Sequence, residues 1–323
     1  MNADLSCLVD PETKSPLHVR DGWLENDRGT RYPIVDGIPR FVPPENYARA
    51  FGDQWQRFPL TQHDSHAGLR RGVDRLTRCL RGQLSEVRGK RVLEAGAGAG
   101  RFTEILLGAG AVLHSFDYSN SVGVIAANSG RHEALTLFQG DIRQIPCARE
   151  SYDYVICLGV IQHTPDPHAS MRSLWSHVKP GGVLVIDQYR WTWWNSLPPP
   201  LGEGLPPYRW YVLRLPPGQQ YAAVERIFEF WYPIVWRFRD SRFMQILLSR
   251  FSPLAVIYPK YGLRDAQMYR EWMLLMLHDA LTDHYKHLCT PREMRRFLAS
   301  LGAVDIVVTT GGNGVEAFCR KPG

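Results

Sequence analysis

Close cysteine pairs, long apolar runs and a leader-like start are all missing from this sequence of 323 residues. No stretch reaches the roughly 18 apolar residues that a membrane-spanning helix needs. Met1–Asp10 has neither the basic nor the apolar part of a secretory leader. A secreted or integral membrane protein is therefore not expected. The six cysteines are scattered along the chain, which favours reduced thiols and a cytoplasmic location.

A strong excess of one charge sign is also missing. The chain has 38 Lys and Arg residues against 32 Asp and Glu residues, a net charge of +6. This excess is compatible with an anionic partner but does not require one, and nucleic acid is not expected as the partner. Tryptophan, by contrast, is locally abundant, because seven of the ten tryptophans lie between Trp191 and Trp272. We therefore look for acceptor binding in that region.

Four regions differ in their residue pattern. Residues 1–60 are polar and rich in turns, residues 61–190 alternate apolar strands with amphipathic helices, and residues 191–289 are rich in Pro, Trp, Tyr and Arg. Residues 290–323 return to one helix and two strands. The alternation predicts an α/β fold, a doubly wound seven-stranded Rossmann-like sheet with a small ribbon-like N-terminal segment and a long, mostly helical insertion.

The expected strands carry the sheet prediction, with helices in the intervals between them. They are Arg91–Ala95, Val112–Phe116, Ala134–Gln139, Tyr154–Val160, Gly182–Gln188, Val304–Thr309 and Val315–Cys319. The last two flank a glycine-rich, hairpin-like turn, so the sheet is expected to end in a reversed strand. Thr290, followed by Pro291 and Glu293, is typical of a helix start.

An arginine-rich helix is expected before the first of these strands. One side of this helix carries apolar residues at helical spacing: Leu69, Val73, Leu76, Leu80 and Leu84. The arginines lie elsewhere around the helix: Arg70, Arg71, Arg75, Arg78 and Arg81. The pattern favours a solvated arginine face, and an RNA-binding stripe is the alternative.

A glycine-rich turn follows the first strand, in the run Glu94-Ala95-Gly96-Ala97-Gly98-Ala99-Gly100. Glycines let a backbone bend sharply and come close to a ligand. The third glycine comes one residue too early for the dinucleotide fingerprint. Asp117 ends the second strand about twenty residues later, where a carboxylate can bind ribose hydroxyls. Asp141 follows the third strand at the same edge of the sheet, which predicts a ligand site there.

These residues resemble the class I S-adenosylmethionine-dependent methyltransferases, in the branch of the ubiquinone and menaquinone methyltransferases. The resemblance also includes the run from Leu158 to Pro167, with Gln162-His163-Thr164-Pro165 at its centre, and Val178–Gly182. The resemblance is strong in sequence over residues 90–190, whereas over residues 290–320 only the expected order of helix and strands is similar. It implies S-adenosylmethionine as cofactor, S-adenosylhomocysteine as product, and methyl transfer to an O, N or C atom of a small molecule of specialised or cell-envelope metabolism.

The resemblance also implies which residues hold the cofactor. The glycine turn would pass under its methionine part, Asp117 would bind the ribose and Asp141 would meet the adenine amino group. Trp55 lies in a segment that crosses the cofactor in similar enzymes, although an aromatic anchor between segments is an equal alternative. The cofactor-binding residues expected are Glu94, Gly96, Ala97, Gly98, Gly100, Asp117, Tyr118, Asp141, Ile142, Leu158, Gly159 and Trp55.

The N-terminal segment is similar to a small zinc-ribbon module that accompanies such enzymes. That module normally carries two Cys-x-x-Cys pairs, but here the positions hold Cys7 with Asp10 and Glu25 with Arg28. One thiolate of four cannot form a structural zinc site, so no metal is expected there.

The candidate catalytic residues are His163 and Tyr189, which follow the fourth strand and end the fifth. In-line methyl transfer needs an oriented nucleophile, and a base if that nucleophile carries a proton. His163 suits proton removal near neutral pH, but it also fits a ring that only binds backbone. Tyr189 could face the sulfonium, with core packing as the alternative. Gln188, Trp191 and Tyr285 are the expected acceptor contacts.

The insertion at 191–289 is expected to form an aromatic lid over the acceptor. A homodimer interface and a peripheral membrane contact are the alternatives. His278, His284 and His287 are not expected to bind a metal. Three other functions stay open: an RNA or protein methyltransferase, transfer of the aminocarboxypropyl group or cyclisation of the cofactor, and a non-catalytic binding module.

Overall fold

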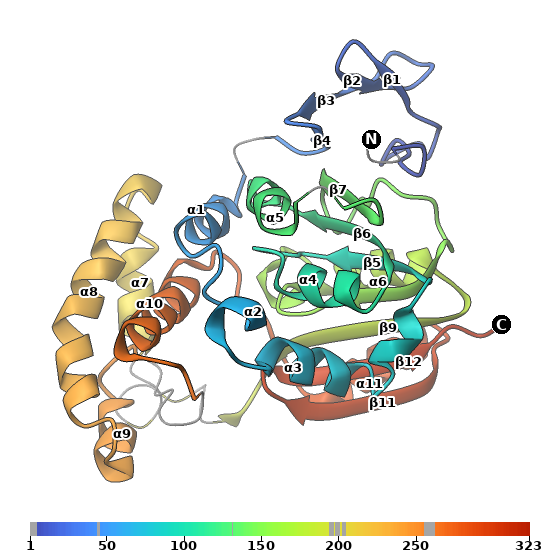
Figure 1. Cartoon of the computed structure of the whole chain (residues 1–323). Helices are drawn as coiled ribbons and strands as arrows, with labels where there is room; N and C mark the ends of the chain where they lie inside the picture. Colours follow the sequence, from blue (N-terminus) through green and yellow to red (C-terminus); the bar gives the residue numbers. More distant parts are fainter. Residues whose placement is uncertain are drawn as a thin grey trace.

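The computed structural model describes residues 5–43, 46–130, 132–193, 197, 201, 205–254 and 262–323. It has three parts in Figure 1: a small N-terminal sheet at the top, an α/β core below it, and a helical insertion on the left. The parts of the insertion at 194–196, 198–200, 202–204 and 255–261 lie outside the described residues.

The N-terminal sheet has four short antiparallel strands that follow one another in space as in sequence. They are β1 (His18–Arg20), β2 (Trp23–Glu25), β3 (Arg31–Val35) and β4 (Ile38–Pro39). Asp21-Gly22 and Asp36-Gly37 form the tight turns, and all four residues have positive φ angles, as two-residue hairpins require. Leu8 and Leu24 are buried in the same apolar cluster as Phe138 of the core. The segment is therefore packed against the core.

Three helices and a 3₁₀ turn connect this sheet to the core: α1 (Arg49–Arg57), α2 (Asp64–Ala67), α3 (Arg71–Cys79) and η1 (Leu84–Val87). The arginine-rich helix is shorter than predicted, because Arg81 and Gly82 adopt positive φ angles that end it. The prediction of a solvated face is wrong for Arg75, whose side chain is only 15% exposed and pairs with Asp187.

The central sheet has the strand order β7-β6-β5-β8-β9-β12-β11. The first five strands of this order are parallel, and β12 runs antiparallel to β9 and β11. The short β10 (Leu288–Cys289) pairs with the end of β9. The bounds are β5 (Arg91–Ala95), β6 (Val112–Asp117), β7 (Leu135–Gln139), β8 (Tyr152–Cys157), β9 (Val178–Arg190), β11 (Val304–Gly311) and β12 (Gly314–Arg320). The predicted doubly wound seven-stranded sheet is confirmed.

Helices cover both faces of this sheet, since its strands are buried on both sides. They are α4 (Arg101–Gly108), α5 (Val122–Ser129), α6 (Pro167–His177) and α11 (Pro291–Ser300), with η2 (Ile161–His163) after β8. The predicted start of α11 is confirmed as a capping box: Thr290 Oγ1 accepts from Glu293 N, and Glu293 Oε2 accepts from Thr290 N.

The insertion forms its own helical layer beside the carboxyl ends of the parallel strands (Figure 1). It contains α7 (Leu205–Val212), α8 (Pro217–Arg237), α9 (Arg242–Leu248) and α10 (Ala266–Thr282). Phe228, Trp272 and Leu277 lie in its separate apolar cluster. Among the residues that the structure describes, no helix is both long and apolar enough to cross a bilayer.

Candidate active site

A cavity of about 630 Å³ lies at the carboxyl edge of the parallel strands. Its walls come from the glycine turn after β5, from the ends of β6, β8 and β9, and from α1, α3 and α10. In open α/β sheets, ligands bind at this edge. The cavity is large enough for a drug-sized ligand, and it joins parts of the chain that lie far apart in sequence.

The glycine turn forms one end of the cavity and has the geometry of a close-contact site. Gly96, Gly98 and Gly100 all have positive φ angles. A Cβ atom at Gly98 would lie 3.0 Å from the Trp55 ring, so the indole of α1 lies directly over the turn. Both alternatives for Trp55 fit this position, since it covers the turn and also ties α1 to the core.

Asp117 ends β6 next to the turn. Its Oδ2 accepts a hydrogen bond from Gly98 N at 2.9 Å, and its Oδ1 accepts from Ser119 N and Ser119 Oγ. Oδ2 therefore has room for one more donor. Tyr118, the next residue, stacks on Tyr47 with ring centroids 4.7 Å apart, and both line the cavity.

Asp141 is less available than Asp117. Arg143 Nε shares its one hydrogen between the two carboxylate oxygens, Arg143 Nη2 donates to Oδ2, and Asp141 is not in the cavity wall. Its neighbour Ile142 does line the cavity. Adenine binding by Asp141 stays a prediction that would require its side chain or that of Arg143 to move.

Glu94 is the last residue but one of β5, just before the glycine turn, and is 2% exposed. Its Oε2 accepts from the hydroxyls of Thr103 and Ser115, whereas its Oε1 has no hydrogen-bond partner among the described residues. Burial raises the pKa of this carboxyl to about 7, and the two hydroxyl donors act against that shift. An unpartnered buried carboxylate oxygen beside the turn fits a site that receives a donor from a ligand.

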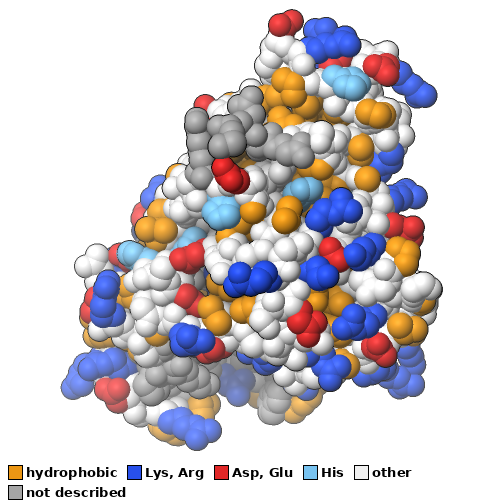
Figure 2. Space-filling view, turned by 45° about the vertical axis from the view of Figure 1, so that its right-hand side comes forward, with side chains coloured by type: hydrophobic (Ala, Val, Ile, Leu, Met, Phe, Trp, Pro, Cys, Tyr) orange, Lys and Arg blue, Asp and Glu red, His pale blue; other side chains and the backbone are white. Residues whose placement is uncertain are grey.

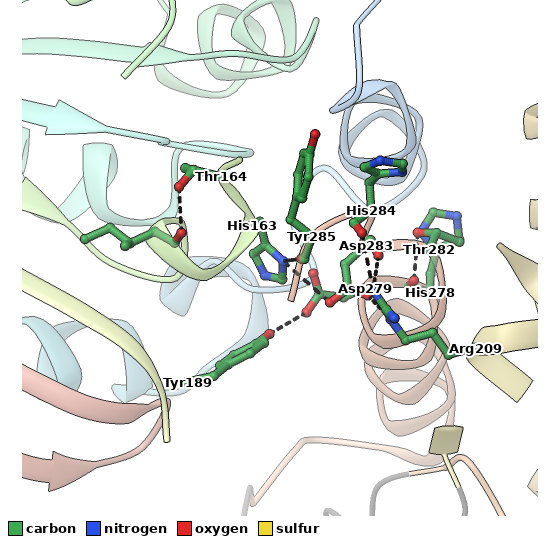
Figure 3. A network of polar contacts seen from close by, with 11 residues as sticks. His163, Thr164, Tyr189, Arg209, His278, Asp279, Thr282, Asp283, His284 and Tyr285 are labelled. Atoms are coloured by element: carbon green, nitrogen blue, oxygen red, sulfur yellow. Dashed lines mark hydrogen bonds and ion pairs between the residues drawn. The ribbon is translucent and has the colours of Figure 1, made fainter. Parts of the chain in front are cut away.

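His163 and Tyr189 line another part of the cavity, its second end, and Figure 3 shows the two side chains close together. Their rings meet edge to face with centroids 5.3 Å apart, and Phe51 packs on the imidazole from α1. The Tyr189 hydroxyl donates to Asp279 Oδ2 at 3.2 Å. Burial, with Asp279 and Asp283 nearby, raises the pKa of Tyr189 well above its ordinary value, so this phenol keeps its proton.

The imidazole of His163 also contacts the end of α10. Its Nδ1 lies 3.2 Å from the carbonyl oxygen of Tyr285 and 3.6 Å from Asp283 Oδ2. Asp283 in turn accepts from Arg209 Nε at 2.7 Å through Oδ1. Figure 3 shows Arg209 and Asp283 on the insertion side of this network and His163 on the core side.

Two buried amides in the cavity wall have unsatisfied groups. Gln54 is fully buried; its Oε1 accepts from His278 Nδ1 at 2.9 Å, while its Nε2 has no partner in the described structure. Gln162 is also fully buried, and neither its Oε1 nor its Nε2 has a partner there. Leaving each such group unpaired costs about 1–3 kcal/mol, so a ligand with donor and acceptor atoms would stabilise this wall.

Sequence reasoning missed several of these residues. Arg75 and Arg78 line the cavity, and their partners Asp187 and Glu316 lie on β9 and β12, far along the chain. Gln54 and Asp283 carried no motif. The one available signal was the placement of Gln162 within the matching run after the fourth strand.

The structure brings most of the predicted site residues to one cavity but not all of them. Those in its wall are Trp55, Gly96, Ala97, Gly98, Asp117, Tyr118, Ile142, Leu158, Gly159, His163 and Tyr189. Those outside it are Glu94, Gly100, Asp141, Gln188, Trp191 and Tyr285. Gln188 is buried in β9, and Trp191 is 45% exposed. Tyr285 contributes its carbonyl oxygen to His163 and packs its ring edge on Tyr47.

Within the described ranges, no three His, Cys, Asp or Glu side chains converge as metal ligands. Of the three histidines considered for a metal, His278 donates to Gln54 and His284 is exposed.

Comparison with known proteins identifies the core. Residues 93–186 match the family model described as a methyltransferase domain. The ubiquinone biosynthesis O-methyltransferase of Coxiella burnetii (strain Dugway 5J108-111) is 31% identical over 107 residues, which are 32% of this chain and 46% of that protein. The demethylmenaquinone methyltransferase of Corynebacterium kroppenstedtii is 30% identical over 147 residues, 45% of this chain and 61% of that protein. The chain thus spans about half the length of the curated relatives it matches.

Similar solved structures include human N-acetylserotonin methyltransferase in complex with S-adenosylmethionine, with a TM-score of 0.47, 15% identity, and coverage of 87% of this chain and 61% of that one. N-methyltransferase NodS from Bradyrhizobium japonicum WM9, in complex with S-adenosyl-L-homocysteine, has a TM-score of 0.42, 17% identity, and coverage of 77% and 87%. The assignment of the domain depends on the sequence matches and not on the TM-scores of these structures. From the sequence matches, the chain contains a class I S-adenosylmethionine-dependent methyltransferase domain.

Proposed function

We propose that this protein transfers a methyl group from S-adenosylmethionine to a small-molecule acceptor. One observation carries the proposal: a single cavity has the glycine turn with Asp117 at one end and His163 with Tyr189 at the other. A methyl donor held at the first end and an acceptor held at the second would meet inside one cavity, and in-line transfer requires such proximity.

The residues at the first end fit the cofactor. The turn from Gly96 to Gly98 leaves backbone open to a ligand, and Asp117 Oδ2 has room for a hydroxyl donor. Glu94 lies behind the turn, outside the cavity wall, and the contact of its unpartnered Oε1 with the cofactor is part of this proposal. Arg75 lies in the same wall with its Nε unpartnered within the described structure, suited to a carboxylate. When bound there, the cofactor would supply a methyl group on a positively charged sulfur. The cofactor contacts of Gly100, Asp141, Leu158 and Gly159 remain part of this proposal.

The second end suits a flat, mostly apolar acceptor. Phe51, Trp272, Leu275 and Met276 line it, and the amides of Gln54 and Gln162 offer polar contacts. The matched relatives are named for ubiquinone and menaquinone biosynthesis, so a ring-containing acceptor of quinone type is the first class to test. Apolar and aromatic walls with a few polar groups are typical of small-molecule sites.

An RNA or protein acceptor is the main alternative, and a basic groove leading to the active edge would favour it. Arg75 and Arg78 are paired with Asp187 and Glu316. Figure 2 shows Lys and Arg interspersed with Asp and Glu over the face drawn, without a continuous basic band there. These pairings support a small acceptor.

The insertion would act as the lid of the acceptor site, since α10 supplies Trp272, Leu275 and Asp279 to the cavity wall. Exposed aromatic residues on its outer helices, among them Trp210, Phe230 and Phe243, keep a dimer interface or a peripheral membrane contact as additional roles. The six cysteines are unbridged, which fits a reducing cytoplasm.

The test is to incubate the purified protein with S-adenosylmethionine carrying a labelled methyl group, alone and with fractionated cell extract. Label in a small-molecule fraction, with S-adenosylhomocysteine formed only when extract is present, supports the proposal. Label in RNA or protein contradicts it in favour of the macromolecular alternative. Methylthioadenosine formed from the cofactor alone would mean a different group transfer. Binding of the cofactor without turnover in any fraction would point to a binding module.

A further inference from the structure

The proton on the His163 ring can be located from its contacts. The Nδ1 atom lies 3.2 Å from the carbonyl oxygen of Tyr285, and a carbonyl oxygen can only accept a hydrogen bond. Nδ1 therefore carries the hydrogen in the neutral ring, and Nε2 carries the lone pair. His163 lines the cavity, and none of the residues that the structure describes forms a hydrogen bond to its Nε2, so this nitrogen is free to accept a proton.

The carboxylate of Asp283 lies near the same nitrogen, Nδ1 of His163. Asp283 Oδ2 lies 3.6 Å from Nδ1, and no hydrogen bond to this oxygen is formed by the residues that the structure describes. The Asp283 side chain is completely buried. A buried carboxylate oxygen without a hydrogen-bond donor lowers the stability of the fold unless a positive charge lies beside it. An imidazolium at His163 would supply that charge.

The insertion fixes this carboxylate in place. Arg209 of α7 donates from Nε to Asp283 Oδ1 and from Nη2 to the Asp283 backbone oxygen, both at 2.7 Å. The other charged or titratable groups around the pair are Lys286 and Asp279, with Tyr189 between Asp279 and the imidazole. Phe51 and Tyr189 hold the ring itself from the core side, as Figure 3 shows for Tyr189.

We propose that Asp283 is a positioning residue that holds His163 with Nε2 free as a base, and that the acceptor is one whose nucleophilic oxygen or nitrogen loses a proton to it. This rests on the proposed function and narrows it to O–H or N–H acceptors. The catalytic base belongs to the core, whereas its positioning residue belongs to the insertion. The proposed base and the residue that positions it therefore come from different parts of the chain.

The reaction step balances with S-adenosylmethionine as the only co-reactant. The acceptor O–H or N–H bond breaks and its proton passes to His163 Nε2. The electron pair left on oxygen or nitrogen forms the bond to the methyl carbon while the carbon–sulfur bond breaks and its electrons stay on sulfur. The positive charge lost from sulfur appears on the imidazole, where Asp283 stabilises it.

The first test needs neither cofactor nor turnover. In protein labelled with ¹⁵N-histidine, the His163 signals, assigned by comparison with His163→Gln, should show the Nδ1–H tautomer above pH 7. The Nε2–H tautomer would overturn the proposal. Because this measurement uses the unmutated chain and no methyl donor, its failure is separate from a failure of the proposed function, which would appear as absent S-adenosylhomocysteine formation.

The second test uses variants of the insertion. Asp283→Asn should lower kcat at least about tenfold with little change in KM, and shift the acid limb of the kcat–pH profile to lower pH, because the carboxylate 3.6 Å from the imidazole is gone. Asp283→Glu should restore part of kcat. Glu271→Gln, a change of a half-buried α10 side chain whose contact with Gln267 is exposed, is the matched control and should leave profile and tautomer unchanged.

Two results would contradict the proposal. If Asp283→Asn folds and keeps both the pH profile and the tautomer of the parent, Asp283 is only structural. If the labelled product carries its methyl group on a carbon that bears no exchangeable proton, the acceptor class is wrong even though methyl transfer stands. Should Asp283→Asn not fold, Arg209→Lys tests the same link, and an unchanged His163 tautomer and pH profile there would also count against the proposal.

Discussion

Arg75 of α3 forms an ion pair with Asp187 near the end of β9, and the Asp187 side chain is fully buried. Asp187 also accepts a hydrogen bond from Gly159 N at 2.6 Å, so it joins the arginine-rich helix to the loop after β8. Arg75 and Gly159 both line the cavity. One buried carboxylate thus holds together two walls of the site that lie far apart in sequence.

The first prediction concerns this pair. Asp187→Asn should lower the free energy of unfolding by about 3–5 kcal/mol, because it leaves the Arg75 charge largely buried without its partner. Urea unfolding of parent and variant measures the difference. The matched control is Glu229→Gln, which removes an exposed partner of Arg270 and should change stability by less than about 1 kcal/mol. Equal losses of unfolding free energy for the two substitutions would show that the buried ion pair contributes no more to stability than the exposed one.

The sequence could predict the sheet because local patterns determine it. The strands of the core are short apolar runs such as Arg91–Ala95, buried in β5 as expected. The glycine turn and Asp117 could also be placed, since both follow strands whose carboxyl ends share one edge. The role of Arg75 could not be predicted, because its partner Asp187 lies 112 residues away and helical periodicity says nothing of such partners.

The acceptor end of the site was harder to predict for the same physical reason. Gln54 and Gln162 are amides whose importance comes only from burial beside a cavity, and burial is set by tertiary packing. Asp283 precedes His284, which was not expected to bind a metal, and the sequence analysis gave Asp283 no role. Only the folded chain brings it within 3.6 Å of His163.

The second prediction tests the glycine turn. Gly98→Ala should weaken S-adenosylhomocysteine binding about tenfold, because an L-residue at φ +60° is strained and its Cβ would lie 3.0 Å from Trp55. Titration calorimetry with S-adenosylhomocysteine gives the affinity. Gly108→Ala is the control: its Cβ would meet nothing within 4 Å, so binding should be unchanged. An unaltered affinity in Gly98→Ala would place the ligand elsewhere in the cavity.

The third prediction concerns the pH dependence of stability through Glu94. Burial raises the pKa of its carboxyl from 4.5 to about 7, so between these values the folded protein binds a proton that the unfolded chain does not. Stability from this group is therefore full below pH 4.5 and is lost as the pH rises to about 7, by about 3 kcal/mol in total.

Comparison with Glu94→Gln isolates this contribution, because glutamine keeps an oxygen for Thr103 and Ser115 but does not titrate. The difference in unfolding free energy between parent and variant should shift in favour of the variant as the pH rises from 5 to 8. Urea unfolding at several pH values measures it. A difference that stays constant with pH would mean that Glu94 titrates normally in the folded protein.

The last prediction concerns metal removal from the N-terminal segment, where hydrogen bonds occupy the place of thiolate ligands. Asp10 is 2% exposed; its Oδ2 accepts from Asn26 Nδ2 and the Tyr32 hydroxyl, both at 3.0 Å, and its Oδ1 accepts from Thr13. Burial alone would raise the pKa of Asp10, but the donors, Thr13 foremost, lower it overall. A charged carboxylate with these donors can hold the hairpins together without a metal.

A chelator should therefore leave the unfolding midpoint unchanged, and metal analysis should find no stoichiometric zinc. Asp10→Ala should lower the free energy of unfolding by about 3 kcal/mol, because several donors lose a charged acceptor at once. Asp27→Ala, in the same segment but with a side chain that is 83% exposed, should have little effect. An unfolding midpoint that falls when chelator is added, or one bound zinc per chain, would contradict this account. The segment would then bind metal like the zinc-ribbon modules that it resembles.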